Sequence, residues 1–266
     1  MSLFERVVVR AGAHLLPKRF AYRLARGLLA TQGIGWAGPK GGMEYSGELA
    51  FVKNLTTGLD RPVIFDVGAN VGDYALACLK ANPQAHLHCF EPSRSHFAVL
   101  EKRIAGNFPH AQVSLNLFGL SDSEREMELN KESDITGLAS LNARDLTHIG
   151  VDQAIKETVL LKIGDEYLTS NAIDHVDLLK IDVEGWEMPV LKGFRRALAR
   201  KLIRAVQFEF GHAHIERREN FRDFYRFLST DFRLGALKPN GELNFLNGYE
   251  EMSENYLATN YVAVLK

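Results

Sequence analysis

The sequence predicts an α/β fold in which helices cover both faces of a mostly parallel β-sheet. From residue 62 onward, short apolar segments alternate with longer segments of helical apolar spacing, as in repeated strand–helix–strand units. A glycine-rich loop follows the first apolar segment, and acidic residues follow the ends of several others. With 266 residues, of which 46% are hydrophobic, the chain is long enough to form one large domain.

The expected elements follow one another along the chain. We expect strands over 63–65, 87–90, 113–118, 176–181 and 205–210, and helices over 75–80, 97–104, 188–198 and 221–228. Residues 122–160 break the alternation, since they are polar at first and end in a strand-like run, so we expect an insertion or an antiparallel detour near the site. Residues 232–237 and 260–265, with a turn signal at 238–241, predict a terminal antiparallel pair.

The first thirty residues differ from the rest because they are basic. Apolar residues at helical spacing predict amphipathic helices there, and a glycine-rich joint follows at residues 33–42. We therefore divide the chain into a helical segment at 1–43 and a main domain at 44–266. We expect the helices to cap the main domain, with a membrane surface or an acidic carrier protein as the alternative partner. The charged residues are Arg6, Arg10, Lys18, Arg19, Arg23 and Arg26 against Glu5 alone.

Composition excludes several classes of protein. The net charge of −1 gives no general attraction to nucleic acid, so no nucleic-acid partner is expected. Cys78 and Cys89 lack the spacing of a zinc site and are expected to be buried free thiols in a reducing compartment. No apolar run is long enough to span a bilayer or to form a signal-peptide core, so the cytoplasm is the expected location. Homo-oligomerisation is left open.

The loop Asp66-Val67-Gly68-Ala69-Asn70-Val71-Gly72 follows the first strand and precedes a helical segment, so its N–H groups should face a ligand. In a dinucleotide fingerprint the second glycine lets pyrophosphate approach the backbone, but Asn70 occupies that position here. The Gly-x-x-x-x-Gly-Lys-Ser/Thr loop of nucleoside triphosphatases is also absent. These features predict a nucleoside ligand without a phosphate chain.

An acidic residue follows the second strand at Phe90-Glu91-Pro92, about twenty residues beyond the glycine loop. A carboxylate at this place can accept hydrogen bonds from both hydroxyls of a ribose. The alternative is an exposed acid that interacts with the dipole of the following helix. Together with the loop, the spacing favours the ligand.

Three carboxylates lie in the run Lys180-Ile-Asp-Val-Glu-Gly-Trp-Glu187, directly after an apolar segment. A second group of titratable residues follows the strand at 205–210, and the two strand ends should meet at one crevice. The candidate bases are Asp182, Glu184, Glu187, Glu209, His212 and His214. Asp182, Glu209 and a histidine could instead hold a divalent cation such as Mg²⁺. Lys180 is expected to point away from Asp182 and to pair with an acid under the sheet.

These motifs, together with Gly119-Leu-Ser-Asp122 and Gly137-Leu-Ala-Ser-Leu141, resemble the FkbM family of S-adenosylmethionine-dependent methyltransferases over residues 44 to 265. The resemblance implies a seven-stranded, doubly wound sheet of methyltransferase (Rossmann-like) topology with a final antiparallel strand, and S-adenosyl-L-methionine as cofactor. It places Asp66, Gly68, Asn70 and Gly72 around the methionine part, Glu91 and Pro92 at the ribose, and Ser121 and Asp122 near the adenine. Asp182 is expected beside both cofactor and acceptor, and Glu48 near the cofactor or, alternatively, as a helix N-terminal acid.

The resemblance implies an O-methyltransferase that acts on a hydroxyl of a small molecule, such as a sugar, a glycan or another secondary metabolite. Asp182, Glu209 and His212 are the expected catalytic residues, because a hydroxyl must lose its proton as it accepts the methyl group. The alternatives are an acceptor carboxylate, amine or carrier-tethered intermediate, a cofactor-binding partner subunit without activity, and a nicotinamide-dependent oxidoreductase.

Overall fold

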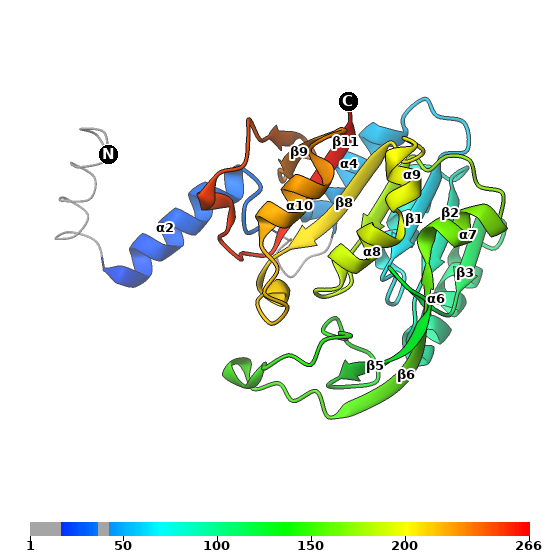
Figure 1. Cartoon of the computed structure of the whole chain (residues 1–266), viewed down its shortest axis with the longest axis horizontal. Coiled ribbons are helices and arrows are strands. Elements are labelled where there is room, and N and C mark those ends of the chain that lie inside the picture. Colours follow the sequence, from blue (N-terminus) through cyan, green and yellow to red (C-terminus); the bar gives the residue numbers. More distant parts are fainter. Residues whose placement is uncertain (1–16, 37–42) are drawn as a thin grey trace.

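The computed structural model describes residues 17–36 and 43–266, which form an α/β domain built on a central sheet (Figure 1). The strands of this sheet are β1 (Val63–Val67), β2 (His86–Phe90), β3 (Gln112–Asn116), β7 (Leu178–Ile181), β8 (Ala205–Phe210), β9 (Phe232–Leu237), β10 (Leu243–Phe245) and β11 (Thr259–Leu265). Their order across the sheet is β10-β9-β11-β8-β7-β1-β2-β3.

The central part of the sheet is parallel, and its last three strands are antiparallel. Strands β3, β2, β1, β7 and β8 run parallel, whereas β11 pairs antiparallel with both β8 and β9, and β10 with β9. The chain starts in the middle at β1, winds outward to β3, and then returns to β7 on the other side. The strand order therefore reverses between β1 and β7, which predicts a ligand crevice at the carboxyl ends of these strands.

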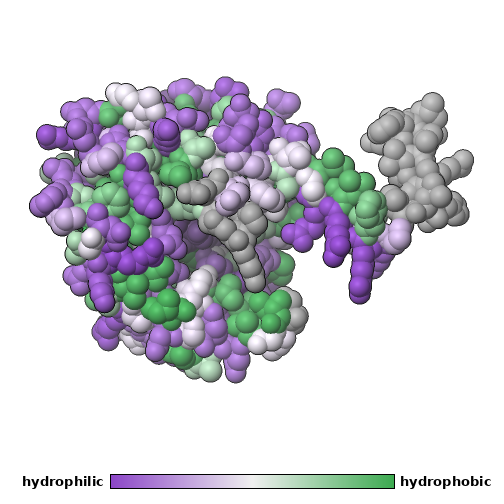
Figure 2. All heavy atoms as spheres, turned by 180° about the vertical axis from the view of Figure 1, so that it is seen from behind, coloured by the Kyte–Doolittle hydropathy of each residue, from purple (hydrophilic) through white to green (hydrophobic). Residues whose placement is uncertain are grey.

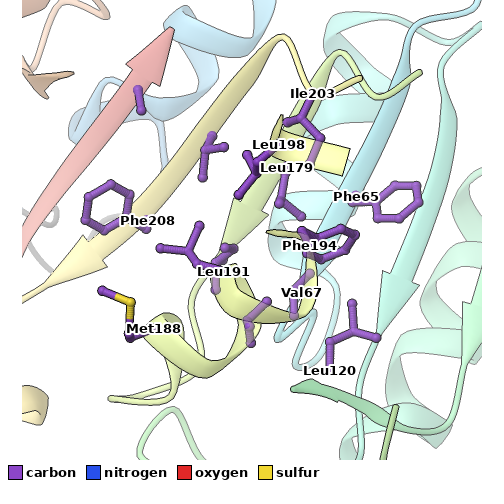
Figure 3. Packing of buried hydrophobic residues seen from close by; sticks show 14 of the residues in the cluster. Phe65, Val67, Leu120, Leu179, Met188, Leu191, Phe194, Leu198, Ile203 and Phe208 are labelled. Carbon is purple, nitrogen blue, oxygen red and sulfur yellow. The ribbon is translucent and has the colours of Figure 1, made fainter. Parts of the chain in front are cut away.

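Helices cover both faces of the sheet, and each face has its own apolar core. Successive strand residues alternate between them: Phe65 and Phe90 face one core, while Ile64 and Cys89 face the other. Figure 3 shows the first core, in which Phe194, Leu191 and Leu198 pack against the sheet. One face carries α4 (Glu48–Thr56), α5 (Asp73–Ala81) and α6 (Arg94–Asn107), and the other carries α7 (Gly164–Ser170), α8 (Glu187–Gly193), α9 (Arg195–Ala199) and α10 (Phe221–Leu228).

The polar segment after residue 118 forms a second, three-stranded sheet. Strand β6 (Ile155–Ile163) pairs antiparallel with β5 (Arg125–Lys131) and parallel with β4 (Gly119–Ser121). The intervening residues 132–154 include the turn η1 (Thr147–Ile149) and lie at the end of this sheet (Figure 1). The expected antiparallel detour is therefore confirmed.

Two expected elements differ in the structure. The main sheet has eight strands in the described residues instead of seven, because the chain after the 238–241 turn adds β10, which is too short to give a sequence signal. The helix expected over 188–198 is divided into α8 and α9 near Gly193. A side chain at Gly193 would overlap the carbonyl of Ser121, so this close approach to β4 requires glycine.

The N-terminal helix does not form the expected packed cap. Helix α2 (Lys18–Thr31) buries none of its residues and extends away from the domain (Figure 1). Expectations for residues 1–16 and 37–42 lie outside the described residues. The short helix α3 (Met43–Ser46) leads into the domain, where the 3₁₀ turns η2 (His212–His214) and η3 (Glu251–Ser253) complete the fold. No helix in the described ranges is long and apolar enough to cross a membrane.

Among the buried polar residues on the sheet is His88 of β2. Its Nδ1 lies 2.9 Å from the hydroxyl oxygen of Tyr167, and its ring packs against Phe65 at a centroid distance of 4.8 Å. Burial, with a smaller contribution from neighbouring His86, lowers the pKa of His88 from 6.5 to about 4. The ring is therefore neutral in the folded protein at pH 7. Both expected free thiols, Cys78 and Cys89, are also buried in this sheet region.

We predict that His88 causes part of the acid sensitivity of the fold. Between pH 6.5 and 4 the unfolded chain binds a proton at His88 that the folded chain does not, which lowers stability on the order of 2–3 kcal/mol. His88→Phe should reduce this loss, as measured by urea unfolding at pH 7 and pH 4.5. Exposed His110→Gln is the control. Equal acid sensitivity of wild type and His88→Phe would contradict the assignment.

Candidate active site

A cavity of about 460 Å³ lies at the carboxyl ends of β1, β2 and β7, where the strand order reverses. Its wall comes from the glycine loop, the residues after β2 and β7, the lead-in helices and the detour sheet. The lining residues that carry the argument are Glu48, Asn70, Glu91, His96, Lys180 and Asp182.

The glycine loop after β1 lies close to the backbone of both neighbouring strands, β2 and β7. The N–H groups of Gly68 and Ala69 both donate to the carbonyl oxygen of Phe90, at 3.0 and 3.1 Å. Gly68 has φ +80°, and a side chain there would overlap the carbonyl oxygen of Asp182. Glycine is required at this position because both the backbone conformation and the interstrand distance exclude a Cβ atom.

Glu91 is held by two backbone donors at the edge of the cavity. Its carboxylate accepts hydrogen bonds from the N–H of Asn70 and from the N–H of Ser93, each at 2.8 Å. An ionised carboxylate can accept about four hydrogen bonds, so capacity remains for a ligand. Burial raises the pKa of Glu91 to about 7, although the two backbone donors oppose this rise.

A segment of the detour, residues 135–141, forms the opposite wall of the cavity and is held by Thr136. The Asn70 amide donates to the carbonyl of Thr136 at 2.8 Å, and the N–H of Thr136 lies 2.9 Å from Nε2 of His96. The same Nε2 lies 3.0 Å from the carbonyl oxygen of Thr136, so this ring nitrogen contacts both polar groups of the Thr136 backbone. The other ring nitrogen, Nδ1, is buried and lies 3.9 Å from the carboxylate of Glu91.

Lys180 connects the two central strands. Asp66 and Lys180 are direct partners in the β1–β7 register, and the ammonium lies 3.2 Å from Asp66 and 3.5 Å from Asp182. Burial opposes its charged form, but the two carboxylates raise the pKa of Lys180 above its ordinary value. The ammonium also lies 5.0 Å from the ring centroid of Tyr74. The expectation that Lys180 points away from Asp182 is therefore wrong, whereas its pairing with an acid is confirmed.

The turn after β7 is fixed by Glu187. Its carboxylate accepts the N–H groups of Val183 and Gly185 and lies 2.8 Å from Nε2 of His214. Burial opposes both charges, yet each partner favours the other, so the pKa of Glu187 is lowered and that of His214 is raised. Both side chains are almost fully buried. The structure thus gives Glu187 and His214, which the sequence offered as candidate bases, a role in holding the turn.

Hydrogen bonds from residues 140–144 of the detour also hold this turn. Glu184 has φ +54°, and its carboxylate accepts a 2.6 Å hydrogen bond from Arg144. The hydroxyl of Ser140 donates to the Glu184 carbonyl, and the Asn142 amide donates to the carbonyl of Gly185. The 180–187 run is therefore held from the detour as well as from η2.

Glu209 and His212 both lie beyond the residues that line the cavity. Glu209 is half-buried near the end of β8, where burial and nearby carboxylates, above all Asp182 and Glu184, raise its pKa well above the usual range. His212 is exposed on η2. Their catalytic roles stay predictions.

The other predicted site residues are divided between the cavity wall and its surroundings. Glu48, Gly68, Asn70, Glu91, Pro92 and Asp182 line the cavity, whereas Asp66, Gly72, Ser121 and Asp122 do not. Asp66 is fully buried beside Lys180, and the hydroxyl of Ser121 accepts a hydrogen bond from the indole of Trp186. Glu48 lines the cavity and is also the first residue of α4, so it is a helix N-terminal acid as well; it is buried and bonded to Gln207 and Ser46.

Sequence reasoning missed His96, Thr136 and an apolar part of the wall made by Leu120, Leu129 and Leu161. The leucines belong to β4, β5 and β6, and only the pairing of the detour sheet brings them together. His96 lies three residues beyond the helix-start Ser93, but a single histidine on a helix carries no specific signal. Among the described residues, no group of three or more His, Cys, Asp or Glu is placed to hold a metal ion, so the Mg²⁺ hypothesis has no support.

Comparison with known proteins gives a consistent result. Residues 66–236 match a family model described as the methyltransferase FkbM domain. The chain is 30% identical over 156 residues to methyltransferase sdnD of Sordaria araneosa, covering 50% of this chain and 60% of that protein. It is 32% identical over 136 residues to hexuronic acid methyltransferase AglP of Haloferax volcanii, covering 51% of each.

A third relative is 2-O-methyltransferase NoeI of Sinorhizobium fredii, which is 27% identical over 150 residues, covering 52% of this chain and 60% of that protein. The chain thus spans about half to three fifths of the length of these curated relatives. A solved SAM-dependent methyltransferase from Agrobacterium tumefaciens aligns with a TM-score of 0.46 at 9% identity, covering 84% of this chain and 62% of that one.

We predict that removal of the Lys180 charge destabilises the sheet at the cavity. Lys180→Met leaves Asp66 buried without its counter-charge, which should cost about 3–5 kcal/mol of unfolding free energy. The double variant Asp66→Asn/Lys180→Met should recover part of this loss, because it no longer buries an unpaired charge. Urea unfolding of both variants tests this, and wild-type stability of Lys180→Met would refute it.

Proposed function

This chain belongs to the FkbM methyltransferase family, and on that premise we propose that it transfers a methyl group from S-adenosylmethionine to a hydroxyl of a sugar or glycan. The family membership makes the protein a methyltransferase, while the methyl donor and the acceptor are the proposal. The observation that supports it is the set of carboxylates in the cavity wall, among which Glu91 retains acceptor capacity for a ligand.

The cavity is rich in carboxylates. Lys180 is the one lysine or arginine in its described wall, which also contains Glu48, Asp73, Glu91, Asp182 and Glu184. S-adenosylmethionine supplies its methyl group from a positively charged sulfur, and such a wall is complementary to that charge. The same wall repels a phosphate chain, so it disfavours the nicotinamide-dependent alternative.

The chain offers a matching group for each part of this donor. Glu91 retains acceptor capacity for two ribose hydroxyls, because its two backbone donors use only part of that capacity. Pro92, Leu120, Leu129 and Leu161 give an apolar wall suited to a purine. Glu48 would face the charged amino-acid end, where Lys180 can pair with a carboxylate.

We predict that ionised Glu91 is required for binding of the donor. S-adenosylhomocysteine should bind more weakly as pH falls below about 7, by up to about tenfold per pH unit, because a protonated carboxyl accepts fewer hydrogen bonds. Isothermal titration calorimetry of wild type, Glu91→Gln and the exposed control Glu101→Gln tests this. Glu91→Gln should bind weakly at every pH, and unchanged binding by this variant would overturn the assignment.

On the acceptor side, Asp182 is the best-placed candidate base. It lines the cavity, its side chain is 44% exposed, and its carboxylate lies 3.5 Å from the Lys180 ammonium. As the acceptor oxygen bonds to the methyl carbon, its proton must leave, and Asp182 can accept it. Glu209 is the weaker candidate base, because it does not line the cavity and because burial and the Asp182 charge raise its pKa and so favour its protonated form.

The name of one relative describes a hexuronic acid methyltransferase and that of another a 2-O-methyltransferase, so the first supports a sugar acid and the second an oxygen as the acceptor. The acceptor could also be a carboxylate of a uronic acid, because deprotonated oxygen needs no base. Dependence of turnover on Asp182 separates these possibilities.

We predict that Asp182→Asn retains binding of S-adenosylhomocysteine within a few-fold but lowers kcat by about 10²–10⁴. Turnover is measured as S-adenosylhomocysteine release with a panel of sugars, uronic acids and oligosaccharides. Asp174→Asn is the control, because Asp174 is exposed and lies at the opposite edge of the sheet, before β7. Equal loss of binding and turnover in Asp182→Asn would show that Asp182 serves the donor and not the acceptor.

A further inference from the structure

Helix α2 is an amphipathic helix without a partner in the described part of the chain. It buries none of its residues, and its large apolar side chains are exposed: Phe20 by 54%, Leu24 by 48% and Leu28 by 61%. These three residues follow one another at intervals of four and therefore lie along one side of the helix. Figure 2 shows apolar residues along one side of the projecting helix and hydrophilic residues along the other.

The other side of the helix is basic. Arg19, Arg23 and Arg26 also recur at helical spacing, and Lys18 adds a fourth cation, whereas the helix contains no acidic residue. Residues 1–31 hold six of the 32 lysines and arginines of the chain but one of its 33 acidic residues. The rest of the chain therefore has a net negative charge, whereas the N-terminal segment has a net positive charge.

The residues that follow α2 are bonded to the domain at the edge of the sheet where the cavity lies. The N–H of Gly35 donates to the hydroxyl of Thr259 at 2.8 Å, and Thr259 pairs with Phe210 at the carboxyl end of β8. The indole of Trp36 donates to the carbonyl of Tyr45 at 2.7 Å. Tyr45 belongs to α3, whose first residue, Met43, lines the cavity.

We propose that α2 is a membrane-surface helix that binds anionic bilayers and holds the cavity edge of the domain near the lipid surface. An exposed apolar strip beside a basic strip is the pattern of helices that lie in the bilayer interface. Four cations without an acid favour an anionic lipid surface, and they repel a second copy of α2. The acidic remainder of the chain does not compete for such a surface, so contact through α2 would be oriented.

This proposal goes beyond methyl transfer and is tested without turnover. The full chain is mixed with phosphatidylcholine vesicles that contain 30% phosphatidylserine, and binding is measured by cosedimentation at low and at high salt. We expect binding to these vesicles, much weaker binding to pure phosphatidylcholine, and weakening by salt.

Two variants separate the apolar and the basic strips. Arg19→Gln/Arg23→Gln/Arg26→Gln should weaken binding to anionic vesicles by about 100-fold, at roughly fivefold per cation. Phe20→Ser/Leu24→Ser/Leu28→Ser should weaken it at least tenfold at every salt concentration. The matched control Lys53→Gln/Lys80→Gln/Lys102→Gln removes three exposed cations from other helices and should bind like wild type.

Because all substituted residues are exposed, folding should be unaffected, which S-adenosylhomocysteine binding and circular dichroism verify. Absence of vesicle binding by the wild type, or equal weakening by the control, would overturn the proposal. Binding of polyglutamate without vesicle binding would instead identify an acidic protein as the partner. Self-association that is lost in both α2 variants, again without vesicle binding, would identify a second copy of the chain.

Discussion

The buried ammonium of Lys180 is the interaction on which the rest of the site depends. It lies between a carboxylate on β1 and a carboxylate after β7, the two strands at which the sheet reverses its order. Removal of Lys180 would leave the fully buried Asp66 without a counter-charge, and removal of Asp66 would leave the buried ammonium with only the partly exposed Asp182. Lys180 and Asp182 both line the cavity, so this interaction also contributes to the charge of the cavity wall.

The detour between β4 and β6 completes a site that the parallel sheet alone leaves open. Parallel strands deliver side chains to one edge of the sheet, but nothing in that geometry covers them. Here the segment around Thr136 closes one side of the cavity through Asn70 and His96, and Arg144 holds the turn at Glu184. In the same region, Lys131 and Ser93 both bond to Glu157, so the detour also supports the loop after β2 that presents Glu91. The detour thus supports both the loop that presents Glu91 and the turn that follows Asp182.

Charge is distributed unevenly on two scales, and both bear on function. Within the cavity, several carboxylates surround one ammonium, which favours a cationic donor over a phosphorylated one. Along the chain, the basic N-terminal segment stands apart from an acidic remainder. The charges of the cavity wall bear on which methyl donor binds, and the charges of the N-terminal segment bear on the proposed contact with a membrane surface.

The sequence by itself determined the α/β class, the strand–helix alternation and the family, because apolar periodicity and contiguous motifs are local properties of the chain. It also identified Glu91, Asn70 and Asp182, since residues directly after strands of a parallel sheet must meet at one edge. Only the tertiary structure decided what each neighbouring acid does. Glu187 is neutralised by His214, Glu184 by Arg144 and Asp66 by Lys180, and each of these pairs joins segments that are distant in sequence. Likewise, His96 and the three leucines of the detour enter the wall through pairing that leaves no trace in local sequence. A carboxylate becomes a ligand, a base or a structural group according to its burial and its counter-charge, and those are properties of the folded chain.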